Sequence, residues 1–167
     1  MRAMAPSLRA SRFLYSAGLL LALSAAGCAG IKPYPNPRER NAVLHVRKDF
    51  GTVLSKIGID VDLYTVDAAC NAGYLGSLEL RDSSVDVGLP LEKRVRLIYV
   101  FSRSSILGRR AATVIEMMLT PHEGYRYEFD VEYVKSGYGA TGLEFAPGET
   151  HGKEIGHAKL SGCIPAS

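Results

Sequence analysis

Hydrophobic and polar residues alternate along most of the chain after residue 42. The clearest run is 125–133, where five apolar or aromatic residues alternate with Arg126, Glu128, Asp130 and Glu132. In a strand, successive side chains point to opposite faces, so this pattern buries one face and leaves the other in water. The run therefore predicts a half-buried strand of an antiparallel sheet.

The same alternation recurs in shorter stretches. They lie at 44–46, 57–65, 78–80, 85–89, 94–101 and 113–119, with weaker candidates at 143–145 and 155–160. About eight short strands with one wet face each predict an all-β fold. We expect a single antiparallel β-sandwich, with a closed barrel as the alternative.

Two glycine-containing stretches are predicted as connections between strands. Pro121-His122-Glu123-Gly124 has the composition of a tight hairpin turn. Gly137 to Gly142 fits the G-x-G-x-x-G pattern of dinucleotide-binding loops. That pattern needs a following helix. The stretch that follows is too short to form one, and Pro147 interrupts it, so we expect a flexible loop.

The N-terminus has the order of an export signal. Arg2, Arg9 and Arg12 precede an apolar run at 13–26, and small residues follow before Cys28. A membrane-spanning helix needs about 20 apolar residues, so this run is better suited to recognition and removal.

Ala25-Ala26-Gly27-Cys28 resembles the lipobox of bacterial lipoproteins. In that family the cysteine becomes the first mature residue and carries acyl chains such as palmitate, which implies a signal peptide at 1–27 and lipidation of Cys28. Lipoproteins of this family favour Leu at the position that Ala25 occupies here. The alternative interpretation is an export signal that is cleaved after Ala26 without lipidation. Ala29 is not the Asp that retains such proteins in the inner membrane, so the resemblance implies the periplasmic face of the outer membrane.

Residues 28–41 contain three alternating prolines, which favour an extended, polyproline-like spacer. We therefore expect a Pro-rich tether at 28–41 that lifts a β-sandwich domain, 42–167, off the membrane. The composition indicates no further domain boundary after Asn41.

Removal of the signal leaves 140 residues, enough for one domain with its own core. It also removes three arginines, and the remaining 17 basic and 17 acidic residues balance. A balanced domain lacks the basic footprint of general nucleic-acid binding. With Cys28 lipidated, Cys70 and Cys163 remain as an even pair that predicts a disulfide in an oxidising compartment.

Three acidic residues offer the one pattern with catalytic potential. Glu128, Asp130 and Glu132 point the same way from one strand, about 6.8 Å apart in alternate positions. Inverting glycosidases hold two carboxyls about 6.5–9.5 Å apart, so a cell-wall glycan hydrolase is the alternative function. Any solvated strand face has the same appearance, and we expect no catalytic residue.

Other motifs of enzymes and metal proteins are missing from the sequence. His151 and His157, with Glu149 and Glu154 nearby, fit no standard zinc spacing and are predicted as loop residues. We expect no metal, no cofactor and no enzyme activity.

The connection at 102–110 is the predicted partner-binding feature. Ile106 and Leu107 lie at its tip between Arg103, Arg109 and Arg110, and two more arginines, at 94 and 96, occupy the adjoining strand. Arginines around an apolar tip suit an anionic glycolipid or another envelope protein. The alternative is a polar hairpin loop whose two apolar residues fold back on the core.

Small disulfide-linked sandwiches on lipid anchors resemble bacterial accessory lipoproteins, including transthyretin-like secretion-system subunits and inhibitors of wall-degrading enzymes. The resemblance implies a non-catalytic binding or assembly module of the cell envelope. It is a likeness of class, without a shared motif.

Overall fold

The computed structural model describes residues 31–37, 39–48, 55–105, 110–134 and 137–163. The chain divides into two units, Met1–Ile31 and Lys32–Ser167, and the strands all belong to the second. Among the described residues, no helix has the length and apolar character needed to cross a bilayer.

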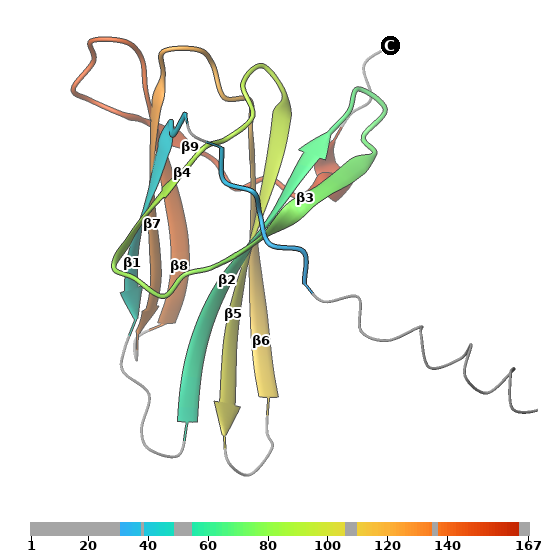
Figure 1. The fold of residues 1–167 in the computed structure, drawn as a ribbon, viewed down its shortest axis with the longest axis vertical. Coiled ribbons are helices and arrows are strands. Elements are labelled where there is room, and N and C mark those ends of the chain that lie inside the picture. Colours follow the sequence, from blue (N-terminus) through green and yellow to red (C-terminus); the bar gives the residue numbers. More distant parts are fainter. Residues whose placement is uncertain (1–30, 38, 49–54, 106–109, 135–136, 164–167) are drawn as a thin grey trace, which may run out of the picture. The chain divides into compact units, whose positions relative to one another are not determined.

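Nine strands in the described part of the chain form two sheets packed as a sandwich (Figure 1). One sheet has the order β4-β1-β7-β8-β9, with β4 at Ser84–Val87, β1 at Ala42–Lys48, β7 at Arg126–Val134, β8 at Gly137–Phe145 and β9 at Lys153–Ile155. The other has the order β3-β2-β5-β6, with β3 at Ala72–Glu79, β2 at Ser55–Val66, β5 at Arg94–Ser105 and β6 at Arg110–Leu119. A short 3₁₀ helix, η1, spans Leu160–Gly162. The predicted sandwich is confirmed.

One sheet departs from the predicted antiparallel arrangement. β1 pairs with β7 in parallel, so the five-stranded sheet is mixed, whereas the four-stranded sheet is antiparallel throughout. Parallel neighbours need a long connection between them. Here that connection contains the whole four-stranded sheet together with β4, which pairs antiparallel with the other side of β1.

The inward residues of the alternating runs form the core between the sheets. Tyr99 and Phe101 of β5 face the core from one sheet, and Tyr127 and Phe129 of β7 from the other, all at most 2% exposed. Burying a large apolar side chain contributes about 1.5–3 kcal/mol, so these strands are held mainly by this layer. Burial also raises the pKa of Tyr99, whose hydroxyl has no hydrogen-bond partner among the described residues.

The turn at 121–124 is not a hairpin, contrary to the prediction. β6 belongs to the four-stranded sheet and β7 to the five-stranded one, so this turn carries the chain from one sheet to the other. Tyr125 N donates to His122 O, and Gly124 takes the expected left-handed conformation with φ of +76°. The composition predicted a turn correctly, but it did not indicate which sheet each flanking strand would join.

The predicted flexible loop at Gly137 to Gly142 is also wrong, because these residues form the first part of β8. A Cβ at Gly142 would lie 2.9 Å from Met117 Cε and 3.0 Å from the Phe129 ring. A side chain at this inward position would therefore collide with the core. The glycine lets β8 pack closely here, and it serves packing rather than phosphate binding.

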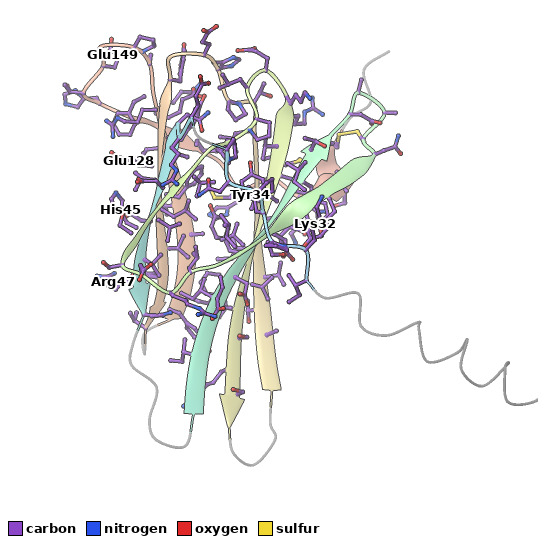
Figure 2. All side chains as sticks on the ribbon, viewed as in Figure 1. Lys32, Tyr34, His45, Arg47, Glu128 and Glu149 are labelled. Carbon is purple, nitrogen blue, oxygen red and sulfur yellow. A yellow bond between two sulfur atoms is a disulfide. The ribbon has the colours of Figure 1, made fainter. Side chains whose placement is uncertain are left out.

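The predicted spacer is largely part of the domain. Residues 32–37 and 39–41, which we call the N-terminal strap, contact the edge of β3 and then the chain at and after β4. Tyr34 N donates to Ser77 O and Ser77 N donates to Lys32 O, both at 2.9 Å. A Cβ at Gly76 would lie 2.6 Å from Tyr34 Cα, so only glycine allows this approach. The Tyr34 side chain is 7% exposed and belongs to the core (Figure 2).

Two asparagines fix the rest of the N-terminal strap. Asn36 donates to Asp86 O and accepts from Gly88 N, and the Asn41 side chain donates to Leu89 O and accepts from Leu89 N. Prolines at 33, 35 and 37 favour an extended backbone, as predicted, but tyrosine and asparagine side chains attach this backbone to the domain.

Candidate functional site

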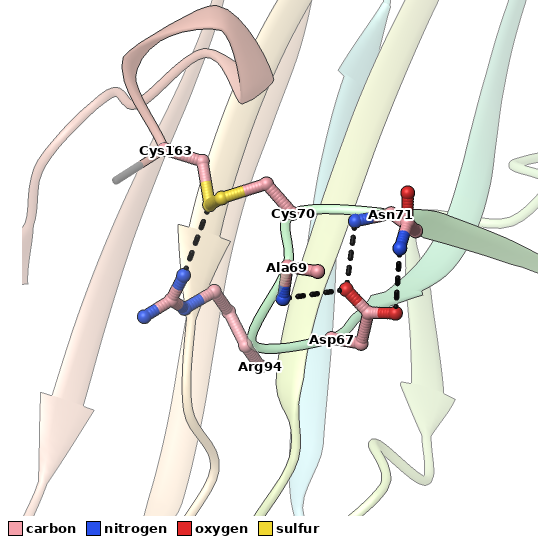
Figure 3. Close-up of a disulfide and its surroundings, with 6 residues drawn as sticks. All are labelled: Asp67, Ala69, Cys70, Asn71, Arg94 and Cys163. Atoms are coloured by element: carbon pink, nitrogen blue, oxygen red, sulfur yellow. Dashed lines mark hydrogen bonds between the residues drawn. A yellow bond between two sulfur atoms is a disulfide. The ribbon is translucent and has the colours of Figure 1, made fainter. Parts of the chain in front are cut away.

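A disulfide joins Cys70 to Cys163, as the cysteine count predicts (Figure 3). The two Cα atoms are 6.0 Å apart, and 93 residues separate them in the sequence. Cys70 lies in the β2–β3 turn, and Cys163 directly follows η1. The bond therefore fastens the end of the described chain to the tip of a hairpin.

The β2–β3 turn is organised by one carboxylate. Asp67 accepts hydrogen bonds from the backbone of Ala69 and Asn71, at 2.9 and 2.8 Å, and from the Asn71 side chain at 3.0 Å. These donors, Asn71 above all, lower the pKa of Asp67 below its usual value. Cys70 adopts φ of +66°, a conformation that non-glycine residues seldom take. The turn thus presents Cys70 for bonding.

Residues Gly156–Cys163, which we call the C-terminal strap, have few other attachments. His157 forms an isolated bridge with Met117 of β6, and Leu160 N donates to Glu116 Oε2 at 3.3 Å. No residue of η1 is buried. Arg94 donates to Cys163 Sγ at 3.1 Å. The disulfide is thus the strongest link between this strap and the four-stranded sheet.

Most of the predicted basic tip lies outside the described residues: Ile106, Leu107 and Arg109. The structure places Arg103 near the end of β5, where it is exposed, and the backbone of Arg110 at the start of β6. β5 and β6 do form the expected antiparallel hairpin. The predicted lipidation site, Cys28, is likewise outside the described residues.

Arg96 does not extend the basic tip. It lies seven residues before Arg103 along β5, about 24 Å away at the rise of a strand. Its guanidinium forms a salt bridge with Glu116 at 2.8 Å, and it lies 5.5 Å from the centre of the Tyr64 ring. Only 15% of its side chain is exposed, and the contacts of this arginine are with residues of its own sheet.

The three acidic residues of β7 do share the outward face, as predicted. Figure 2 shows Glu128 on this side of the sheet, with His45 and Arg47 of the neighbouring β1. Glu128 forms an ion pair with Arg126, and Glu132 forms one with Arg47. A groove of about 460 Å³ runs beside Asp130 and Glu132, and His45 lines it as well.

The predicted loop histidines are exposed, and they lie in the chain after β8. His151 Nδ1 is 3.2 Å from Thr150 Oγ1, while His157 bridges to β6. Within the described ranges, no three residues among His, Cys, Asp and Glu come close enough to hold a metal ion.

A larger groove of about 730 Å³ opens where three separate segments meet. The N-terminal strap contributes Pro37, the loop between β4 and β5 contributes Pro90 and Leu91, and the β6–β7 turn contributes Tyr125. Leu91 is 37% exposed although it is a large apolar residue. Pockets of this size with a largely apolar lining are typical of ligand or peptide sites. We call it the strap groove.

The strap groove is also lined by polar and charged residues: Glu39, Arg40, Asn41, Glu123 and Arg126. Asn41 is bonded to Leu89, and the Arg126 guanidinium lies 4.0 Å from the centre of the Phe145 ring. Strap-groove recognition can therefore combine apolar contact with contacts to charged side chains.

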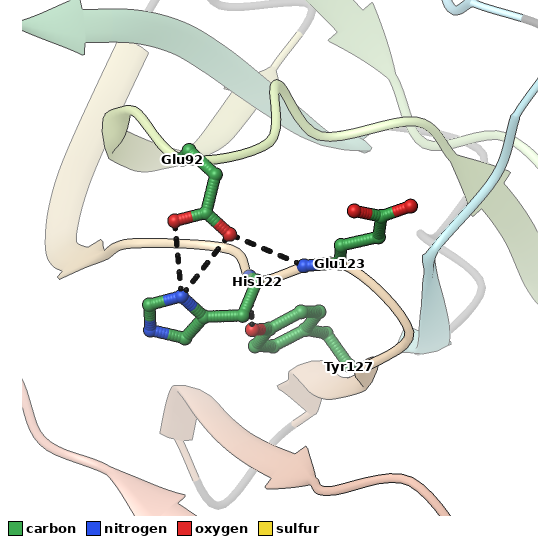
Figure 4. Close-up of polar contacts among 4 residues, drawn as sticks. All are labelled: Glu92, His122, Glu123 and Tyr127. Atoms are coloured by element: carbon green, nitrogen blue, oxygen red, sulfur yellow. Dashed lines mark hydrogen bonds and ion pairs between the residues drawn. The ribbon is translucent and has the colours of Figure 1, made fainter.

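A cluster of polar contacts fixes the β6–β7 turn beside the groove (Figure 4). Glu92 accepts from Glu123 N and contacts His122 Nδ1, each at 3.3 Å. His122 N donates to the hydroxyl of Tyr127 at 2.9 Å. Burial raises the pKa of Tyr127 above its usual value. The β6–β7 turn is thus fixed by Glu92 of the β4–β5 loop and by Tyr127 of β7.

Sequence reasoning missed the strap groove because its lining comes from three distant segments. One signal was present. Leu89-Pro90-Leu91 is an apolar run that a proline keeps out of a regular strand. An apolar run outside the alternating pattern marks residues that pack by other means or remain exposed.

A scan of protein-family models and a search of curated proteins each found no match to this chain.

Proposed function

We propose that the chain is the precursor of a lipid-anchored lipoprotein of the outer membrane, whose domain faces the periplasm as a non-catalytic binding or assembly module. The observation that carries the binding role is the strap groove, where Pro37, Pro90, Leu91 and Tyr125 form an apolar part of the lining. Such a groove suits an apolar segment of another envelope protein. The arginines at 103, 109 and 110 offer a second contact, for an acidic partner or an anionic glycolipid.

The lipid anchor is supported by the residues at 25–28 and by the even pair of cysteines that remains after Cys28 is used. The Cys70–Cys163 disulfide fits an oxidising compartment such as the periplasm. Two or more acyl chains on one cysteine would bind a bilayer stably, whereas a single chain binds only marginally.

Packing of the N-terminal strap changes the proposed geometry. Only residues 29–31 lie between Cys28 and Lys32, where the folded unit begins. Four backbone steps span at most about 14 Å, compared with roughly 40 Å for a free spacer of thirteen residues. The domain would therefore lie close to the bilayer, and its partner would be close to the membrane too.

The non-catalytic assignment is supported by the partners of the β7 carboxylates. Glu128 and Glu132 each form an ion pair with an arginine on the outward sheet face. Ion pairs of this kind are ordinary on solvated sheet faces, so the row of carboxylates needs no catalytic role to explain it.

Anchoring is tested by following the processing of the full chain in cells. A globomycin-type inhibitor of lipoprotein processing should leave the precursor uncleaved, and the wild-type mature chain should begin at Cys28 and sediment with membranes. Cys28→Ser should lose both properties. Normal processing under the inhibitor, or a mature chain that washes off membranes, would contradict the anchor.

The binding role is tested by crosslinked pull-down from the envelope of cells that carry the full chain. Leu91→Asp should lose the partner that the wild type captures. Tyr74→Asp is the matched control, because Tyr74 is 39% exposed and lies on β3, away from the groove. Equal capture by both variants would reject the strap groove as the binding site.

The alternative function has its own test. Glu128→Gln, Asp130→Asn and Glu132→Gln should each leave function in cells unchanged. A large loss at one of these positions, with folding intact, would instead favour the glycan hydrolase.

A further inference from the structure

Two of the four edge strands are short, since β9 has three residues and β4 has four. β3 has eight residues, and the N-terminal strap bonds to it at one position, Ser77. Unpaired edges template pairing with other chains, and short or covered edges are the usual protection.

β6 is the longest of the four edge strands. It has ten residues, and on its outer side the described chain pairs with it only at Met117, through His157 of the C-terminal strap. The stretch Arg110–Glu116 contains no proline, glycine or lysine, the residues that commonly disrupt edge pairing. We call this stretch the open edge.

Part of the sheet surface beside the open edge is apolar. Val114 is 52% exposed and lies opposite Val100 in the β5–β6 register. Ile98 follows two residues away on the same face of β5 and is partly exposed. An apolar surface that runs to an unpaired edge is typical of strand-to-strand association.

We propose that the open edge pairs antiparallel with the same stretch of a second copy of this chain, about a two-fold axis at Thr113. The four-stranded sheets of the two copies then form one continuous sheet. Because the interface is isologous, each residue meets the partner residue at the mirror position about Thr113. Ala112 lies opposite Val114, and Arg110 lies opposite Glu116.

The mirror positions favour a second copy over an unrelated strand. Arg110 and Glu116 are the two charged residues of the open edge, they have opposite charges, and they lie equally far from Thr113. Opposite charges directly across a strand pair are favourable, and like charges are not. Glu116 meets Arg96 and Leu160 N through Oε2, and its Oε1 has no partner among the described residues.

The C-terminal strap also sets the register. Its bridge at Met117 ends the open edge on one side, and β6 begins at Arg110 on the other. Thr113 is the midpoint of what remains, so only pairing centred there uses the whole edge in both copies.

A disulfide trap tests this register in the full chain as cells produce it. Directly opposite residues of an antiparallel pair have Cα atoms about 4.5–5.5 Å apart, within the range that a disulfide spans. Thr113→Cys should give a covalent dimer on a non-reducing gel after mild oxidation. Thr150→Cys, in the exposed segment between β8 and β9, should stay monomeric. No dimer from Thr113→Cys, or equal dimer from both variants, would overturn the proposal.

A second substitution distinguishes a crosslink that depends on the proposed register from one that forms by random encounter of two chains. Adding Val114→Lys to Thr113→Cys should reduce the covalent dimer at least tenfold, because it places a lysine beside the partner strand. Adding Leu91→Lys, a similar change at the strap groove, should leave the dimer intact. Equal yields in the two double variants would reject the register, and capture of a different protein by the Thr113→Cys variant would reject a second copy as the occupant.

Discussion

The two straps of the domain cover sheet edges by different means. The N-terminal strap is held by the buried Tyr34 side chain and by two asparagines that bond to backbone groups. The C-terminal strap contributes no buried residue from η1 and depends on a covalent bond from Cys163 to Cys70. One end is fixed by packing, and the other is fixed by a crosslink.

The difference shows what each sequence can support. A segment with a large aromatic residue can gain enough from burial to offset the entropy of ordering its backbone. A segment rich in glycine and polar residues, such as 156–163, cannot, and a disulfide lowers the entropy of the unfolded chain instead. The second means works only where the disulfide persists.

The largest expected effect follows loss of the crosslink. Cys70→Ser combined with Cys163→Ser should lower the free energy of unfolding by about 4 kcal/mol, because the closed loop is long. Urea unfolding of the mature protein, followed by circular dichroism, measures this change. A loss below about 1 kcal/mol would mean that other contacts hold the C-terminal strap.

Removing the aromatic anchor of the other strap should have a slightly smaller effect. Tyr34→Ala should cost about 3 kcal/mol, the range found when a buried aromatic residue is truncated. Ile31→Ala, directly before the strap at a residue that is 80% exposed, is the control and should cost less than about 1 kcal/mol. Similar losses in the two variants would show that the N-terminal strap is not anchored by burial.

The hydroxyl of the same residue gives a finer test. Tyr34 Oη donates to Gly88 O in a largely buried position. Tyr34→Phe keeps the ring but leaves that carbonyl without its donor, so stability should fall by about 1 kcal/mol. A neutral result in the same unfolding experiment would assign the whole contribution of Tyr34 to its ring.

The smallest expected effect is a change in pH dependence at the disulfide-bearing turn. The pKa of Asp67 is lowered, so its carboxylate stabilises the fold fully above the usual aspartate pKa of about 3.9, and this contribution disappears as pH falls through the lowered value. Asp67→Asn should therefore be less stable than wild type at pH 7, and the difference should shrink below about pH 4. A difference that does not depend on pH would exclude the carboxylate as its source.

Strand positions were predictable because alternation records burial residue by residue. The run at 125–133 became β7, with Phe129 inward and Asp130 exposed. Alternation does not record which strands pair. The parallel contact between β1 and β7, and the passage from one sheet to the other at 121–124, depend on the packing of the whole domain.

The errors share a physical origin in residues that composition assigns to loops. Gly137 to Gly142 lacked an alternating pattern because glycine has no side chain, yet Gly142 is required where β8 meets the Phe129 ring. The prolines before residue 38 indicated a spacer, although Tyr34 among them was the residue that determined the packing. The strap groove was not predictable, because its walls meet only in the folded domain.

Hydrogen exchange of the mature protein before and after reduction tests most directly how the two ends are held. The account predicts that reduction of the Cys70–Cys163 bond removes amide protection from Gly162 and Cys163, whose backbone bonds lie in the C-terminal strap. Protection of the Tyr34 and Ser77 amides should remain. Loss of protection at both ends together, or no loss at the C-terminal strap, would contradict it.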